Sequence, residues 1–130
     1  MRTPPLLLCL ALLATAAACG GGDGAGDPTG STCPPGSTLS YETFGNDFMQ
    51  SYCVECHASD LPAAERMGAP TGVDFDTLEG ILDRAGEIDS AAAAGPDATN
   101  TLMPPAEQPQ PTEAERMMLG EWLACETAAQ

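Results

Sequence analysis

The feature that most constrains this chain of 130 residues is the pentapeptide Cys53-Val54-Glu55-Cys56-His57. It places two cysteines three residues apart, immediately before the only histidine of the sequence. Three kinds of site use such a group. It could be half of a zinc site, a thiol redox pair or the attachment point of a haem, with thioethers to both cysteines and iron on the histidine. The rest of the sequence has to distinguish between them.

The N-terminal segment has the composition of an export signal. Arg2 precedes a largely apolar run from Leu6 to Ala18, which is too short to span a membrane, so we predict a signal peptide over residues 1–18. The sequence Ala16 to Cys19 resembles the lipobox of bacterial lipoproteins, which implies a lipid-modified Cys19 and an outer-membrane lipoprotein facing the periplasm. The alternative is ordinary signal cleavage, which gives a soluble periplasmic or secreted protein.

The segment after Cys19 is rich in Gly and Pro and has no apolar period. We therefore expect a flexible tether over residues 19–37 and a single folded domain over residues 38–130.

The charge balance limits the possible partners. The chain has 19 acidic residues against four arginines and no lysine, for a net charge of −15. This composition argues against nucleic acid and anionic lipid, because both require a basic surface. We expect contact with a membrane only through a lipid anchor. The acidic surface either steers a basic partner or is simply solvated.

Cysteine usage predicts one disulfide. Export leads to an oxidising compartment, Cys9 leaves with the signal, Cys19 is the lipidation candidate, and two cysteines belong to the pentapeptide. The two that remain, Cys33 and Cys125, are expected to pair. The alternative is a Cys33 that stays free or pairs between molecules.

The apolar pattern predicts helices and no strands. A first helix is expected around residues 39–53 with Ser40 as its N-cap. One or two short helices follow between about Asp74 and Gly95, and residues 58–73 and 96–111 are expected to be loops because they are rich in Pro and Gly.

The last predicted helix begins with a capping box formed by Thr112 and Glu115. The apolar face of this predicted helix consists of Met118, Leu119, Trp122, Leu123 and Cys125.

The haem interpretation of the pentapeptide fits the remaining sequence best. A structural zinc site would need a second pair of ligands, which the sequence does not offer. A thioredoxin-like redox pair would need a βαβ unit around it, and no strand is predicted. A haem with two axial ligands needs one more, and Met103 is held in a loop by the prolines at 104 and 105. Met67 is the competitor, but only ten residues separate it from His57. Met49, Met117 and Met118 are expected to fill the core.

These motifs resemble those of class I cytochromes c. The resemblance is carried by Cys53 to His57, by Gly45 eight residues before Cys53, by "LMPP" around Met103, and by the apolar face of the last helix around Trp122. It implies a small all-α fold whose N- and C-terminal helices cross at Gly45, with the helices packed around one covalent haem c. The short spacing from His57 to Met103 implies trimmed loops.

The resemblance also implies site residues and a function. Cys53 and Cys56 would form the thioethers, His57 would be the proximal and Met103 the distal ligand of the haem iron. A backbone carbonyl would accept the His57 Nδ1–H, with Pro70 as the candidate and Pro62 as the next one. The lysine ring of mitochondrial-type relatives is absent, so their acidic docking partners are not carried over.

The function expected is one-electron transfer between unknown redox proteins, with no enzymatic activity, alone or as a subunit of a redox complex. A haem-containing accessory, sensor or peroxidase-like domain with a labile distal ligand is the alternative, and a disulfide-stapled binding module without haem is a third possibility. Arg66, Arg84 and Arg116 are the cations that could meet a haem propionate.

Overall fold

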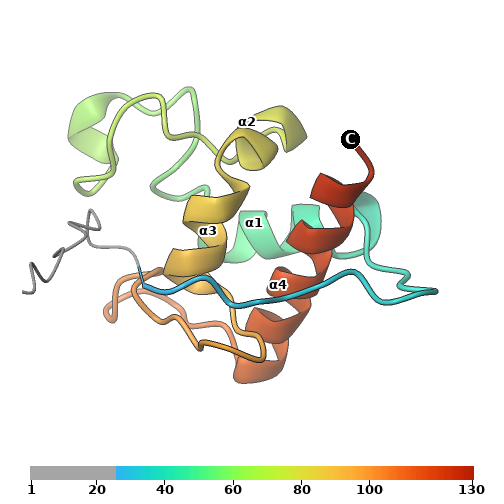
Figure 1. The fold of residues 1–130 in the computed structure, drawn as a ribbon. Coiled ribbons are helices and arrows are strands. Elements are labelled where there is room, and N and C mark those ends of the chain that lie inside the picture. Colours follow the sequence, from blue (N-terminus) through green and yellow to red (C-terminus); the bar gives the residue numbers. More distant parts are fainter. Residues whose placement is uncertain (1–25) are drawn as a thin grey trace, which may run out of the picture.

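The computed structural model describes residues 26–130, and these residues form an all-α domain (Figure 1). They contain no strand, only an isolated bridge between Ala94 and Thr99. The all-α expectation is therefore confirmed. In chain order the elements are η1 (Tyr41–Gly45, a π-helix), α1 (Asn46–Tyr52), η2 (Ala63–Glu65, a 3₁₀ turn), α2 (Leu78–Asp83), α3 (Ala85–Ala92) and α4 (Glu113–Ala128).

The predicted N-caps begin two of these helices. The Ser40 hydroxyl accepts from the Thr43 N–H at 3.2 Å, and the Thr43 hydroxyl accepts from the Ser40 N–H at 2.9 Å, which closes a capping box. Thr112 and Glu115 form the same box at the start of α4. These contacts satisfy backbone donors that a helix cannot pair internally.

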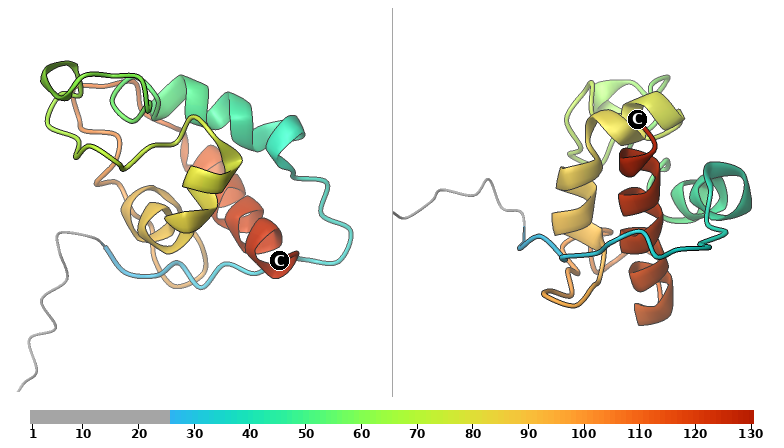
Figure 2. Two further views of the ribbon diagram at one scale, coloured as in Figure 1. Left: turned by 90° about the horizontal axis from the view of Figure 1, so that it is seen from above. Right: turned by 45° about the vertical axis from the view of Figure 1, so that its right-hand side comes forward.

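Helices α3 and α4 lie side by side, while η1 and α1 cross α4 on another side (Figure 2). The crossing is closest at Gly45, where an added Cβ would lie 2.5 Å from Cε2 and Cη2 of Trp122. Phe44 and Tyr41 also pack against the Trp122 ring, with centroids 6.1 Å and 6.5 Å away. Glycine is therefore required at position 45 because the indole occupies the space of any side chain.

The core is completed by apolar side chains from every α-helix and from the loop before α2. Its buried members are Phe48, Met49, Phe75, Ile81, Ala85, Ile88, Ala92, Ala93, Leu119, Trp122 and Leu123. Met49 fills the core as expected, but the expectation for Met117 and Met118 is wrong, because both side chains are largely exposed.

The tether prediction is wrong for its described part, residues 26–37. This segment runs across α3 and α4 (Figures 1 and 2) and is fixed by hydrogen bonds. The buried Thr29 donates from its N–H and its hydroxyl to the Asp89 carboxylate at 2.8 Å and 2.6 Å. Asn100 donates to the Asp27 carbonyl at 2.8 Å. Side chains of α3 and of the loop after it satisfy this backbone, so the packed chain begins before residue 38.

A disulfide between Cys33 and Cys125 closes this segment onto α4, as the cysteine count predicted. The two residues are 92 positions apart, and their Cα atoms are 4.6 Å apart. Nearly the whole domain therefore lies within one covalent loop.

The predictions for the signal peptide of residues 1–18 and for the lipidated Cys19 fall outside the described residues. Within residues 26–130, none of the helices combines the length and the apolar character needed to cross a membrane.

Candidate functional site

The pentapeptide forms one further turn where α1 ends. The Cys53 N–H still donates to the Met49 carbonyl at 2.9 Å, but Cys53 itself leaves the helical conformation with φ −122°. The N–H groups of Cys56 and His57 then donate to the Cys53 carbonyl at 3.1 Å and 3.0 Å. This turn brings two free thiols and the imidazole together at one end of α1.

The two thiols lack the electrostatics of a redox pair. Burial raises the pKa of Cys53 to about 12, against a smaller lowering effect of the Arg116 guanidinium. Burial and the neighbouring Glu55 carboxylate also raise the pKa of Cys56. Reactive redox cysteines have lowered pKa values because the thiolate is the nucleophile. The thiol redox alternative is therefore disfavoured.

A zinc site finds no donor set in the described part of the chain. Within residues 26–130, no group of three or more His, Cys, Asp and Glu side chains is arranged to hold a metal ion. The four ligands of a structural zinc site are therefore not brought together around Cys53 and Cys56.

His57 is oriented through one ring nitrogen. Its Nδ1 lies 2.9 Å from the Val73 carbonyl oxygen, and its ring stacks on Phe75 with centroids 4.6 Å apart. The Phe75 N–H donates to the His57 carbonyl at 2.7 Å. Burial lowers the pKa of His57, which favours the neutral ring. With the Nδ1 proton donated to a carbonyl, the lone pair is on Nε2 and can bind a metal.

The expectation that Pro70 supplies this carbonyl is wrong, and so is the next candidate, Pro62. The Pro70 carbonyl accepts from Arg66 Nη2 at 2.9 Å, and the Pro62 carbonyl accepts from the Glu65 N–H in η2. The chain then turns at Gly72, where φ is +81°, and this turn brings Val73 to the imidazole. No sequence motif marks Val73 for the role.

Arg66 has a role in the loop that sequence reasoning missed, because it was considered only as a cation for a haem propionate. Its side chain is only 1% exposed, and its guanidinium donates to five oxygen atoms of the loop around it. The acceptors are the carbonyls of Ala58 (2.7 Å), Ala69 (3.3 Å), Pro70 (2.9 Å) and Val73 (2.8 Å) and the Asp74 carboxylate (2.7 Å). The only signal in the sequence for this role was that Arg66 is the one cationic residue of a loop rich in Pro and Gly.

Met103 combines a fixed backbone with an accessible side chain. Its N–H donates to the Ala91 carbonyl at 3.0 Å, and its carbonyl accepts from Arg116 Nη1 at 2.8 Å. The same nitrogen of the buried Arg116 also donates to the carbonyls of Ala92 and Asn100. The Met103 side chain remains 44% exposed. Its thioether is therefore available to a ligand while the loop beneath it is held.

Met67, the competing sulfur ligand, has different surroundings. It has a positive φ of 51° and a side chain that is 56% exposed. Its Sδ accepts from Gln108 Nε2 at 3.5 Å, so the thioether already has a partner in the loop that follows Met103. Within the part of the chain that the structure describes, no side chain binds the backbone of Met67 as Arg116 binds that of Met103.

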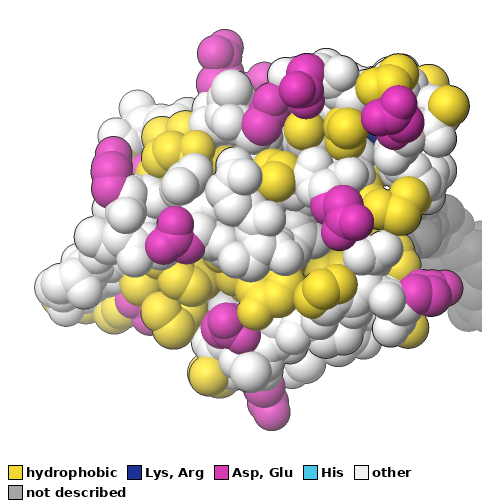
Figure 3. Space-filling view, turned by 180° about the vertical axis from the view of Figure 1, so that it is seen from behind, with side chains coloured by type: hydrophobic (Ala, Val, Ile, Leu, Met, Phe, Trp, Pro, Cys, Tyr) yellow, Lys and Arg dark blue, Asp and Glu magenta, His cyan; other side chains and the backbone are white. Residues whose placement is uncertain are grey.

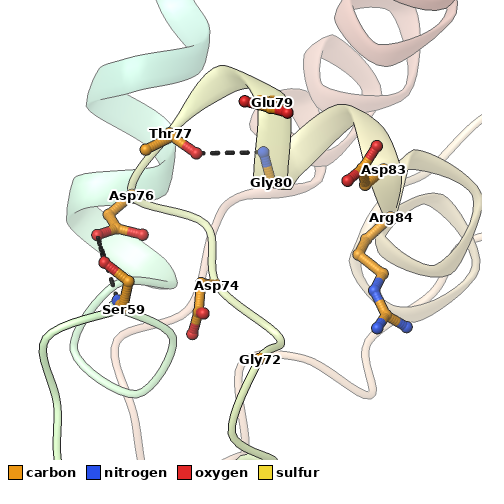
Figure 4. A pocket seen from close by; sticks show the side chains of 9 residues that line it. All are labelled: Ser59, Gly72, Asp74, Asp76, Thr77, Glu79, Gly80, Asp83 and Arg84. Atoms are coloured by element: carbon orange, nitrogen blue, oxygen red, sulfur yellow. Dashed lines mark hydrogen bonds between the residues drawn. The ribbon is translucent and has the colours of Figure 1, made fainter.

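A separate hollow of about 320 Å³ lies beside α2 (Figure 4). It is lined by carboxylates of Asp74, Asp76, Glu79 and Asp83, and its wall includes a 2.7 Å hydrogen bond from Ser59 to Asp76. Neither the cysteines of the pentapeptide nor Met103 belongs to its lining. The hollow thus lies outside these residues but is bordered by Asp74, the ion-pair partner of Arg66.

The charged side chains exposed on the described domain are almost all acidic. Arg66 and Arg116 are buried, and Arg84, with a side chain 39% exposed, is paired with Glu87 at 2.9 Å. Figure 3 shows acidic side chains scattered over the rear face among apolar ones, with hardly any basic atoms. Of the three arginines considered for a haem propionate, Arg66 and Arg116 are engaged in the interior and Arg84 is paired with Glu87 at the surface.

Comparison of the chain with protein-family models, with curated proteins and with solved structures gave no match, so its function has to be argued from its own residues.

Proposed function

We propose that this chain is a mono-haem c-type cytochrome of the class I type, which carries single electrons between redox proteins. The observation that carries the proposal is the state of the pentapeptide. Cys53 and Cys56 are free although another cysteine pair of the chain is oxidised. His57 has its Nδ1 on a backbone carbonyl, so the metal-binding lone pair is left on Nε2.

The residues present fit a covalently attached haem. Cys53 and Cys56 would hold it through thioethers, and His57, through Nε2, and Met103 would be the ligands of its iron. The accessible thioether of Met103 suits this role, while Met67 is engaged by Gln108. The packing of Trp122 on Gly45 supports the finer fold assignment, in which the first and last helices cross.

Haem iron would supply a reversible one-electron couple, and methionine ligation raises its reduction potential. The chain's part is to keep both ligands in place. Val73 fixes the imidazole ring, and Arg116 fixes the backbone of Met103 at its carbonyl. Ligands held in this way do not have to move when the charge changes, which suits a carrier more than an enzyme.

The location and the partners are part of the same proposal. The sequence before residue 26 supports export and a lipid anchor at Cys19, which would place the domain on the periplasmic side of a bacterial outer membrane. Among residues 26–130 only Arg84 is an arginine at the surface, and this acidic surface favours redox partners that dock through a basic face.

Spectroscopy of the protein co-expressed with a haem-attachment system tests the proposal. We expect a Soret band that stays with the chain after denaturation and organic extraction, and its loss from the C53A/C56A variant. The oxidised protein should also show the weak red absorption of a methionine–iron(III) bond. Absence of protein-bound haem would refute the proposal and favour a binding module.

Two methionine variants test the distal ligand. Met103→Ala should abolish the red band and lower the potential, while the matched control Met67→Ala should leave both unchanged. If the red band survives Met103→Ala, the distal assignment is wrong. If native protein already binds carbon monoxide rapidly in its reduced form, the alternative of an accessory, sensor or peroxidase-like domain is favoured instead.

A further inference from the structure

We infer that Arg66 is a positioning residue for His57, acting through the Val73 carbonyl, and that the Arg66–Asp74 pair sets the reduction potential of the bound haem. The inference about the potential rests on the proposed function, whereas the positioning role rests on contacts among the described residues alone.

The Val73 carbonyl oxygen has two donors. It lies 2.9 Å from His57 Nδ1 and accepts from Arg66 Nη2 at 2.8 Å. A carbonyl oxygen has two lone pairs, so both donors can bind at once. The position of the imidazole is therefore coupled to the position of the guanidinium through one shared atom.

The guanidinium also determines where this carbonyl lies. Residues 58–74 contain only one short turn, η2, as regular structure. Arg66 binds the beginning of this loop at Ala58 and its end at Pro70 and Val73. The planar fork of arginine can reach several oxygens in fixed directions, which the point charge of lysine cannot. The loop that carries the Val73 carbonyl, the acceptor for His57, is thus folded around the guanidinium of Arg66.

The guanidinium charge predicts the sign of an electronic effect. The Arg66 cation and the His57 ring share the Val73 carbonyl oxygen as acceptor, so the positive charge lies close to the proposed iron ligand. A nearby positive charge disfavours the more positive, oxidised iron. Removing Arg66 takes this charge away, so the reduction potential should fall.

Asp74 acts in the opposite direction. Its carboxylate lies 2.7 Å from Arg66 Nη2 and its side chain is 27% exposed. Asparagine at position 74 would keep the oxygen that accepts from Arg66 but lose the negative charge. The guanidinium charge would then be uncompensated near the haem, so the potential should rise. A loss of structure alone does not predict opposite signs for the two partners of one ion pair.

The experiment compares three variants of the full chain in the haem-loaded form. Arg66→Met removes the guanidinium, Asp74→Asn removes its counter-charge, and Arg84→Gln is the control, because it removes an equal charge from the exposed pair with Glu87. Spectroelectrochemistry should show at least a tenfold change in the redox equilibrium constant, about 59 mV, downward for Arg66→Met and upward for Asp74→Asn. Arg84→Gln should shift it by much less.

Nitrogen-15 NMR of the His57 ring in the protein as isolated gives the second readout. We expect a slowly exchanging Nδ1 proton in the native chain and in Asp74→Asn, and fast exchange in Arg66→Met. Equal exchange of the Nδ1 proton in the native chain, Asp74→Asn and Arg66→Met would overturn the positioning role. Potential shifts of the same sign for Arg66→Met and Asp74→Asn would overturn the electronic role.

The two failures are distinguishable. If no haem is attached, the absent Soret band refutes the proposed function and with it the role in the potential, and the NMR readout then decides the positioning role alone. If Arg66→Met does not fold, Asp74→Asn still decides the electronic role. If haem is attached and neither Arg66→Met nor Asp74→Asn shifts the reduction potential, the inference about the potential is wrong while the proposed function stands.

Discussion

The Gly45–Trp122 contact allows the cost of a single methyl group to be estimated. Alanine at an interior helix position stabilises a helix by about 1 kcal/mol relative to glycine. At Gly45, however, the methyl would lie 2.5 Å from two atoms of the Trp122 ring, and closer still to Cζ2, against an ordinary contact of 3.4 Å or more. To reach an ordinary contact with those two atoms, the methyl and the ring would have to move apart by about 0.9 Å or more.

The indole has no room for such a movement. Trp122 is fully buried, Phe44 and Tyr41 contact its ring, and its Nε1 donates to Glu126 at 3.0 Å. Overpacking of a core costs about 1–3 kcal/mol and occasionally more, and the rigid neighbours favour the upper end here. After the helix-propensity gain, we expect Gly45→Ala to destabilise the domain by about 2 kcal/mol. For a domain of this size that lowers the melting temperature by roughly 10–15 °C.

Thermal unfolding followed by circular dichroism measures this effect, with Gly86→Ala as the matched control. Gly86 is also in a helix, and a Cβ there meets nothing within 4 Å, so its replacement should be neutral or stabilising by up to about 1 kcal/mol. Trp122→Phe shortens the ring and should recover part of the loss in the Gly45→Ala background. The reasoning is refuted if Gly45→Ala melts no lower than Gly86→Ala, or if the two effects at positions 45 and 122 add without coupling.

Two further predictions concern the ends of the domain. Removing the disulfide with C33S/C125S should destabilise the domain by about 4–5 kcal/mol, because the bond closes a loop of 92 residues; an unchanged melting temperature with and without reductant would contradict this. Hydrogen bonds from Thr112 lower the pKa of Glu115, so its contribution to stability is present above its ordinary pKa and is lost as pH falls through the lower, folded-state pKa. Denaturant titrations between pH 6 and pH 3 should therefore show a steeper fall for the native chain than for Glu115→Gln, and equal slopes would refute the assignment.

The parts of the structure that the sequence predicted are those with local causes. A hydroxyl three residues before its partner is enough to specify the caps at Ser40 and Thr112, because the bonds stay within one turn. The disulfide followed from counting cysteines. Gly45 and Trp122 could be paired only through the resemblance, since nothing local links two residues so far apart in the chain.

The parts that the sequence did not predict depend on contacts between irregular segments. Val73 holds His57 because Arg66 folds the loop between them, and a loop built on a buried cation has no periodicity to detect. The segment before residue 38 looked like a tether because it lacks apolar residues. Its packing instead uses polar atoms, as in the bonds of Thr29 to Asp89. The exposure of Met118, which helical spacing placed on the apolar face, shows that spacing alone does not identify the buried face.

The disulfide also determines how the domain would carry a mechanical load. A pull on the chain before Cys33 would first shear the bonds between Thr29 and Asp89, and would then pass through the Cys33–Cys125 bond directly into α4. Cys53, His57 and Met103 all lie within the covalent loop that this bond closes, so the tension would bypass them. A domain attached through its N-terminal side could thus be dragged and turned without strain on the residues proposed to hold its haem.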